Sequence, residues 1–260
     1  MSPIEILGKF SNAPTAIDFL KTNAVDLIFL DIEMSMVPGT EGQKIWSCGW
    51  RNSYIAETMK DKLLQGTVEP LLSYFNQLIP LSKEEKELVT EKFHARLFRK
   101  RQYLLQEGDV CTQCYFVVRG CLRMYMIDDK GSTHILQFAA ENYWINDLGS
   151  FHSQKPSALN IDALEDTMVL QISRDDLVAI YKQAPKFDRI FRVLIENNFV
   201  GVQKRLLQYI SSSAEGRYQS FLETYAHLVN RLPQTQIASF LGITPEFLSR
   251  LRSKRRSPKS

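Results

Sequence analysis

The C-terminal end of the chain concentrates side chains that can bind phosphate. From Pro233 to Ser260 there are six basic residues against one acidic residue, Glu246, whereas the whole chain of 260 residues has a formal net charge of only +3. A local excess of cations is typical of a surface that meets nucleic-acid phosphates. A solvated basic tail has the same composition, so charge alone does not decide between them. The basic residues are Arg250, Arg252, Lys254, Arg255, Arg256 and Lys259.

Cysteine and histidine are the other residues that could carry chemistry. Cys111 and Cys114 have a C-x-x-C spacing and Cys121 follows, but no fourth ligand is apparent, and a structural metal site normally needs four. Cysteine in or beside a strand commonly acts as a small apolar residue. The four histidines are scattered, and no nucleophile–base or paired-carboxylate arrangement stands out. We therefore expect no metal, no cofactor and no enzyme activity.

Short strands separated by turns fill the middle of the sequence. Leu71 to Ile79 has helical spacing, and Ser82 with Glu85 forms a capping box that opens a second helix. The aromatic and β-branched runs that follow predict a sandwich or barrel. These runs lie at 102–105, 115–119, 121–127, 133–139, 158–163 and 167–172.

A long helix is predicted from Pro185 to about Ser211. Its apolar residues recur every three or four positions, and about 27 residues would extend ~40 Å, which is more than a small barrel needs for its core. We expect the stripe to pair with a second copy of the chain, and the alternative is that the stripe is wholly internal core. The predicted dimer residues are Phe191, Ile195, Phe199, Val202 and Leu206.

The last part of the chain has the pattern of a helix-turn-helix. After a serine break at 211–213 and a helix over 216–228, Pro233 opens a short helix, Gly242 provides the turn, and Thr244 caps a helix that begins at Pro245. An ordinary helical hairpin would not require arginines on its second helix. The expected inward residues are Ile237, Ala238, Leu241, Phe247, Leu248 and Leu251.

Residues 69–260 resemble the Crp/Fnr family of bacterial transcription regulators, particularly the forms common in Bacteroidetes. The segments Leu104–Asp109 and Tyr115–Gly120 match the cyclic-nucleotide-binding β-roll, and roll, long helix and helix-turn-helix come in the family's order. The resemblance implies sequence-specific binding of double-stranded DNA, with Glu246 and Arg250 at base-reading positions. The strands of the usual wing are absent or minimal. The expected DNA-binding residues are Thr235, Thr244, Glu246, Ser249, Arg250, Arg252, Lys254, Arg255 and Arg256.

The same resemblance locates an effector pocket but argues against cyclic AMP. Where cyclic-AMP-binding members have Gly-Glu and Arg-Ser, this chain has Asn146-Asp147 and Ser157-Ala158, and Val202-Gln203 replaces Thr-Ser on the long helix. Ser157 cannot neutralise a buried phosphate. We therefore expect a small-molecule effector of unknown identity.

The N-terminal end resembles part of a response-regulator receiver. A nearly continuous apolar run over 24–30 is typical of a buried parallel strand, and it ends in Asp31 at the position of the phospho-acceptor. The acidic pair for Mg²⁺ and the later lysine are missing, so phosphoryl transfer would lack its charge stabilisation. We predict a relic, and the alternative function is a response regulator controlled by phosphorylation at Asp31.

These observations predict an α+β protein with five segments. They are a truncated receiver-like fragment (1–45), a linker (46–68), a β-roll sensor (69–185), a dimerisation helix (186–212) and a helix-turn-helix domain with a basic tail (213–260). Hydrophobic residues make up 44% of the chain and charged residues 23%, with no ~20-residue apolar run and no signal peptide. A cytoplasmic homodimer is expected, with RNA polymerase as a further partner and no membrane contact.

Overall fold

The computed structural model describes residues 67–256, with side chains described as far as residue 253. The chain divides into residues 1–50 and 51–260, and all described residues belong to the second unit. Asp31, the receiver-like segment and nearly all of the expected linker lie outside the described residues.

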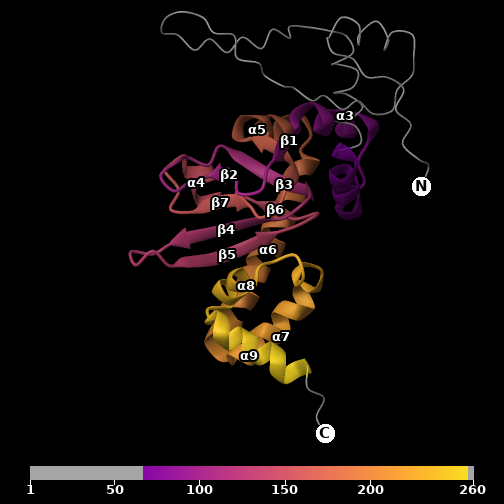
Figure 1. Ribbon diagram of the computed structural model, residues 1–260. Coiled ribbons are helices and arrows are strands. Elements are labelled where there is room, and N and C mark those ends of the chain that lie inside the picture. The colour runs from indigo at the N-terminus through magenta and orange to yellow at the C-terminus, as the bar shows by residue number, and fades with distance from the viewer. Residues whose placement is uncertain (1–66, 257–260) are drawn as a thin grey trace, which may run out of the picture. The chain divides into compact units, whose positions relative to one another are not determined.

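Two antiparallel four-stranded sheets form the β-roll (Figure 1). The strand runs that the sequence predicts are confirmed within a few residues, whereas β1 and the two-residue β6 were not predicted. One sheet has the order β1 (His94–Phe98), β8 (Thr167–Ser173), β3 (Gln113–Arg119) and β6 (Trp144–Ile145). The other has the order β2 (Tyr103–Leu105), β7 (Asn160–Ala163), β4 (Leu122–Ile127) and β5 (Thr133–Ala139).

Helices close one side of the roll around an aromatic core. Helix 67–78 brings Phe75 against Trp144 and Phe191, with ring centroids 5.9 and 5.8 Å apart. The predicted capping box opens α3 (Lys83–Lys92): the N–H of Glu85 donates to Ser82 Oγ, and the N–H of Ser82 donates to the Glu85 carboxylate. Large aromatic side chains supply much of the apolar area that such a core removes from water.

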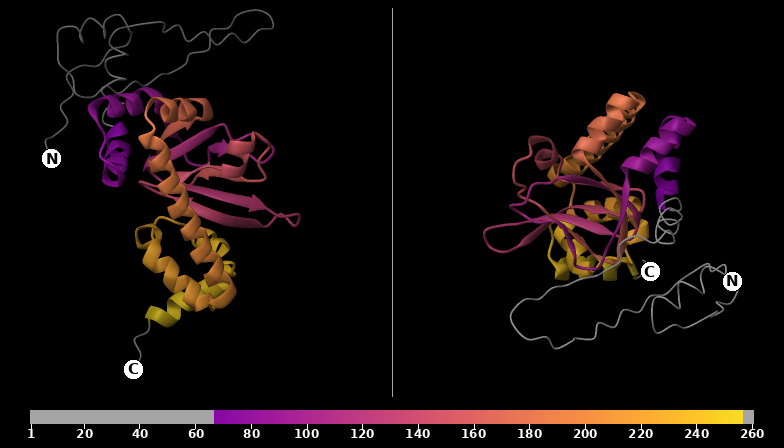
Figure 2. Two further views of the ribbon diagram at one scale, coloured as in Figure 1. Left: turned by 180° about the vertical axis from the view of Figure 1, so that it is seen from behind. Right: turned by 90° about the horizontal axis from the view of Figure 1, so that it is seen from above.

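The predicted long helix is confirmed as α6 (Lys186–Ser211), which follows α5 (Arg174–Gln183). Its first turns are buried in the roll core through Phe187, Ile190 and Phe191. Beyond them α6 continues from the strands towards the C-terminal helices, as Figure 2 shows from behind. The helix therefore links the β-roll to the C-terminal part of the chain.

The C-terminal helices pack in a second core on the outer side of β4 and β5. They are α7 (Ala214–Thr224), the 3-10 turn η1 (Ala226–Leu228), α8 (Gln234–Leu241) and α9 (Pro245–Arg256). The single helix expected over 216–228 is thus divided. The break at 211–213 is confirmed, because Ser212 is extended and the Ser213 side chain caps α7 by accepting from the N–H of Gly216.

Candidate nucleic-acid interface

The turn between α8 and α9 has the geometry that the sequence predicts. Gly242 ends α8 in the left-handed conformation at φ +64°, a region that favours glycine. Thr244 then caps α9, because its Oγ1 accepts from the N–H of Phe247 at 3.2 Å. Pro245 occupies the first helical position, where the missing N–H has no cost. The two caps fix how α9 leaves the turn.

Apolar side chains hold the two helices together, with one departure from expectation. Of the predicted inward residues, four are buried and Leu251 is half-buried. Phe247 is 36% exposed, so its prediction as a core anchor is wrong. A short helix can bury only one stripe, and Leu248 occupies it, while the Phe247 ring lies 5.3 Å from the guanidinium carbon of Arg250. Phe240, which was not predicted, is buried and packs on Phe138 and Phe221.

The predicted DNA-binding residues lie mainly on exposed surface. Arg252 is half-buried, and α9 continues through residues 254–256, so these belong to the helix instead of a separate tail. The pKa of Glu246 is lowered because its own backbone N–H and the Thr244 hydroxyl donate to it and Arg250 is near. The start of α9 therefore presents an ionised carboxylate beside a cation. The exposed members are Thr235, Thr244, Glu246, Ser249 and Arg250.

Polar contacts join α8 to the strands of the roll, and none of them was predicted. The Arg123 guanidinium on β4 donates to both carboxylate oxygens of Asp162 at 2.7 Å and to Gln236 Oε1 at 2.6 Å. Ser239 donates to the carbonyl of Thr133 and accepts from the N–H of Ile135. These side chains fix the orientation of α8 on β4 and β5.

A second link runs through Arg231, which precedes α8. Its guanidinium donates to both oxygens of Glu141, at 2.9 and 3.0 Å, and also to Glu165. Burial alone would raise the pKa of Glu141, but the bonds from Arg231 and from the N–H of Gly120 lower it to about 2. Glu141 is therefore ionised across the physiological range and bridges a turn of the roll to the helical part.

The predicted effector residues separate into two groups. Asp147 caps α4 (Leu148–Ser153) by accepting from the N–H of Ser150, and its other oxygen accepts from the Ser157 hydroxyl at 2.6 Å. The remaining members of this group are Asn146, whose buried Nδ2 has no partner in the structure, and the exposed Ala158. Val202 and Gln203 are exposed on α6, and Val202 lines a different cavity.

The cysteines at 111, 114 and 121 are free and buried. Burial raises the pKa of the Cys114 and Cys121 thiols to about 12, which disfavours the thiolate that binds metals. Within residues 67–256, no group of three or more histidine, cysteine or acidic side chains could hold a metal ion. No helix in this part of the chain is long and apolar enough to cross a membrane.

Comparison with known proteins follows the same division of the chain. Residues 95–184 match the family model of the cyclic nucleotide-binding domain. An anaerobic regulatory protein of Aggregatibacter actinomycetemcomitans is 27% identical over 164 residues, covering 59% of this chain and 63% of that protein. The transcriptional regulatory protein btr of Bordetella pertussis is 26% identical over 189 residues, covering 68% of this chain and 76% of the relative.

Solved structures share the fold. A transcriptional regulator of the Crp/Fnr family from Eubacterium rectale matches with a TM-score of 0.56 at 20% identity, covering 71% of this chain and 88% of that one. FixK2 from Bradyrhizobium japonicum matches with a TM-score of 0.54 at 21% identity, covering 62% and 83%. These proteins give no support to the narrower Bacteroidetes resemblance or to a receiver. Residues 95–184 thus match a cyclic nucleotide-binding domain, and the chain is similar in sequence and in fold to transcription regulators of the Crp/Fnr type.

Proposed function

We propose that the chain binds double-stranded DNA at a specific sequence, with α9 as the recognition helix in the major groove. The observation that carries the proposal is a capped helix-turn-helix whose second helix exposes Glu246, Ser249 and Arg250 at its start. An arginine fork suits the two acceptors of guanine, and a carboxylate accepts from the amino group of cytosine. The basic residues 254–256 at the end of α9 would contact phosphates and set register without reading sequence.

A second part of the proposal is that the chain acts as a homodimer through α6. Ile195, Phe199, Val202 and Leu206 are each 44–61% exposed, and they fall on one side of the helix at steps of three and four. Phe191, the fifth predicted interface residue, is only 7% exposed and packs within its own chain, so it is left out of the proposed interface. A two-fold pairing would place two recognition helices ~34 Å apart, on a near-palindromic operator.

The effector of the β-roll is proposed to be something other than cyclic AMP. Where a phosphate would need a cation, the chain has the Asp147 carboxylate. This carboxylate already accepts hydrogen bonds from the N–H of Ser150, at the start of α4, and from the Ser157 hydroxyl. An incoming phosphate would meet this negative charge and find neither donor free. Titration of the full chain with cyclic AMP in a calorimeter tests the point, and micromolar binding would contradict it.

The function itself is tested by selecting bound sequences from a random DNA library with the full chain. We expect one enriched, near-palindromic motif, and an affinity for it that falls linearly with the logarithm of salt concentration. Motif and random DNA should be compared at several salt concentrations, because the phosphate contribution is common to both. Equal affinity for both at every salt concentration would show that the chain does not read sequence.

A further inference from the structure

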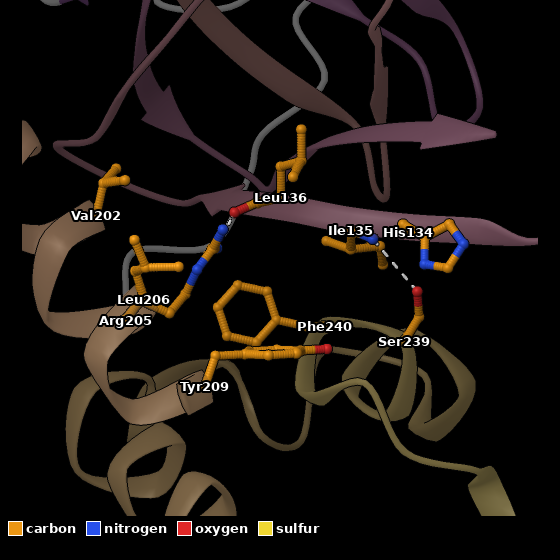
Figure 3. Close-up of a pocket in the computed structure, with 9 residues that line it drawn as sticks. All are labelled: His134, Ile135, Leu136, Val202, Arg205, Leu206, Tyr209, Ser239 and Phe240. Atoms are coloured by element: carbon orange, nitrogen blue, oxygen red, sulfur yellow. Dashed lines mark hydrogen bonds between the residues drawn. The ribbon is translucent and has the colours of Figure 1, made fainter. Parts of the chain in front are cut away.

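A cavity of about 240 Å³ lies where β5, α6 and α8 meet (Figure 3). Its walls are mostly apolar and include the rings of Tyr209 and Phe240. Asp147 and Ser157 do not line it, whereas Val202, from the second group of expected effector residues, does. The volume is slightly below the ~300–1,000 Å³ of typical ligand pockets, which suits a small metabolite.

Arg205 on α6 is the single charged side chain of this wall whose charge has no acidic partner among the described residues. Its guanidinium donates to the backbone carbonyl of Leu136 and lies 5.0 Å from the centre of the Phe240 ring. Burial lowers its pKa, since no nearby carboxylate compensates. The other ionisable side chain in the wall is His134, and its Nε2 lies 2.8 Å from the carboxylate of Asp128.

Other half-buried arginines near the helices are compensated. Arg123 pairs with Asp162, and Arg231 pairs with Glu141 and Glu165. Arg217 donates to the carbonyls of Leu241 and Ser212, where α8 and α6 end and helix dipoles are negative. Arg205 instead donates to a single backbone carbonyl, that of Leu136 on β5.

Val202 and Leu206 belong both to the cavity wall and to the exposed stripe of α6, so α6 of a second copy paired in parallel would lie beside the cavity, but it would not supply the missing charge. The acidic residues of α6 are Asp188 and Glu196. Glu196 lies nine residues before Arg205, which is ~13 Å along the helix axis. In a partner helix that runs parallel, the Glu196 carboxylate would be equally far from Arg205 along the axis.

From the half-buried, uncompensated guanidinium and the apolar cavity beside it, we propose that this cavity binds a small organic anion, a carboxylate or a phosphate with an apolar body. The anion meets the free donors of Arg205, and the apolar body lies against Tyr209 and Phe240. Because the walls come from β5, α6 and α8, occupancy alters how α8 rests on β5. The effect on DNA rests on the proposed function, whereas anion binding does not.

Calorimetric titration of the full chain with benzoate and with phenyl phosphate tests the proposal and separates the carboxylate from the phosphate. Benzamidine, which has a similar shape and the opposite charge, is the ligand control. We expect at least one anion to bind once per chain, at least tenfold more tightly than benzamidine. Failure of both anions to bind, or equal binding of benzamidine, would overturn the proposal.

Three variants locate the site. Arg205→Gln should weaken anion binding at least tenfold because it removes the charge, and Arg205→Lys should keep part of the affinity because it keeps the charge. Lys204→Gln is the matched control, because it removes an exposed cation from the same turn without touching the cavity. Unchanged binding in Arg205→Gln would overturn the assignment, and the wild-type comparison of benzoate with benzamidine stands even if this variant fails to fold. Operator binding without anion binding would refute this site alone, and anion binding without operator binding would refute the proposed function alone.

Discussion

Gly242, at the turn of the helix-turn-helix, lies directly against Tyr209 near the end of α6. A Cβ built on Gly242 would be 1.7 Å from the Tyr209 hydroxyl oxygen and 2.7 Å from Cζ. The guanidinium carbon of Arg217 lies 4.9 Å from the centre of the Tyr209 ring, and its Nε donates to the carbonyl of Leu241. The turn therefore lies against the long helix at a point where an added side chain would have to displace the Tyr209 ring.

Gly242→Ala should lower the free energy of unfolding by about 2–3 kcal/mol, with ~1 kcal/mol from the left-handed φ and the rest from displacing Tyr209. Denaturant unfolding gives the value. Gly108→Ala is the matched control, because Gly108 has φ +91° and no atom within 4 Å of an added Cβ, so only the ~1 kcal/mol backbone cost is expected. In a Tyr209→Ala background the cost of Gly242→Ala should fall to about the same value. An equal cost in both backgrounds would show that the close approach has no energetic effect.

The ion pair between Glu141 and Arg231 predicts a pH-dependent stability. The pKa of Glu141 is about 2 in the folded chain and ~4.3 when unfolded, so the pair stabilises above pH ~4.5 and the contribution is lost as pH falls towards 2. Because both side chains are about a third exposed, Glu141→Gln should cost about 1–2 kcal/mol at pH 7. Urea unfolding at pH 7, 5 and 3 should show the gap to wild type narrowing with acid.

The exposed Glu107 provides the control for that series, because it lies in the same roll and its carboxylate makes no hydrogen bond or ion pair with another described residue. Glu107→Gln should change stability by less than about 0.5 kcal/mol at each pH. A gap between wild type and Glu141→Gln that stays constant from pH 7 to 3 would contradict the role of the carboxylate charge.

What the sequence could predict was mostly local. The capping box at Ser82, the left-handed turn at Gly242 and the Thr244 cap are each decided by side chains within a few residues, and the structure confirms all three. Strands β1 and β6 escaped prediction because His94–Phe98 has a weak apolar pattern and β6 has two residues. They become strands only through pairing with β8 and β3.

The contacts that fix the candidate interface on the roll could not be predicted in this way. The bond from Arg123 to Gln236 joins residues 113 positions apart, and that from Arg231 to Glu141 joins residues 90 apart. Nothing in local spacing distinguishes these arginines from solvated ones. The exposure of Phe247 has the same origin, since the side of α9 that packs against the core carries Leu248 and Leu251.

Arg250→Ala should weaken operator binding by about 1–3 kcal/mol and relax the preference at one base position, because the side chain is expected to read a guanine. Deleting residues 254–260 should weaken all sequences alike and flatten the salt dependence, since it removes four cations at ~0.9 each in the slope. Fluorescence anisotropy with operator and scrambled duplexes separates the two effects. Lys182→Ala on α5 removes a charge that lies far from α9 in the sequence, and it should alter neither the base preference nor the salt dependence. Uniform weakening by Arg250→Ala would mean that it contacts phosphate only.

The exposed stripe of α6 predicts that the chain dimerises and that one charge can prevent it. Phe199 is 61% exposed in the single chain, although burying such a side chain gains ~1.5–3 kcal/mol. Phe199→Glu would put a carboxylate in that apolar contact on both copies, so we expect wild type to sediment as a dimer at micromolar concentration and the variant as a monomer. Asn197→Glu adds the same charge two positions earlier, ~200° around the helix, and should remain dimeric.

If the wild type is monomeric and still binds a single half-site, the stripe serves another purpose. If both variants dissociate, the interface is wider than the stripe, because a charge on the opposite side of α6 would then also oppose pairing.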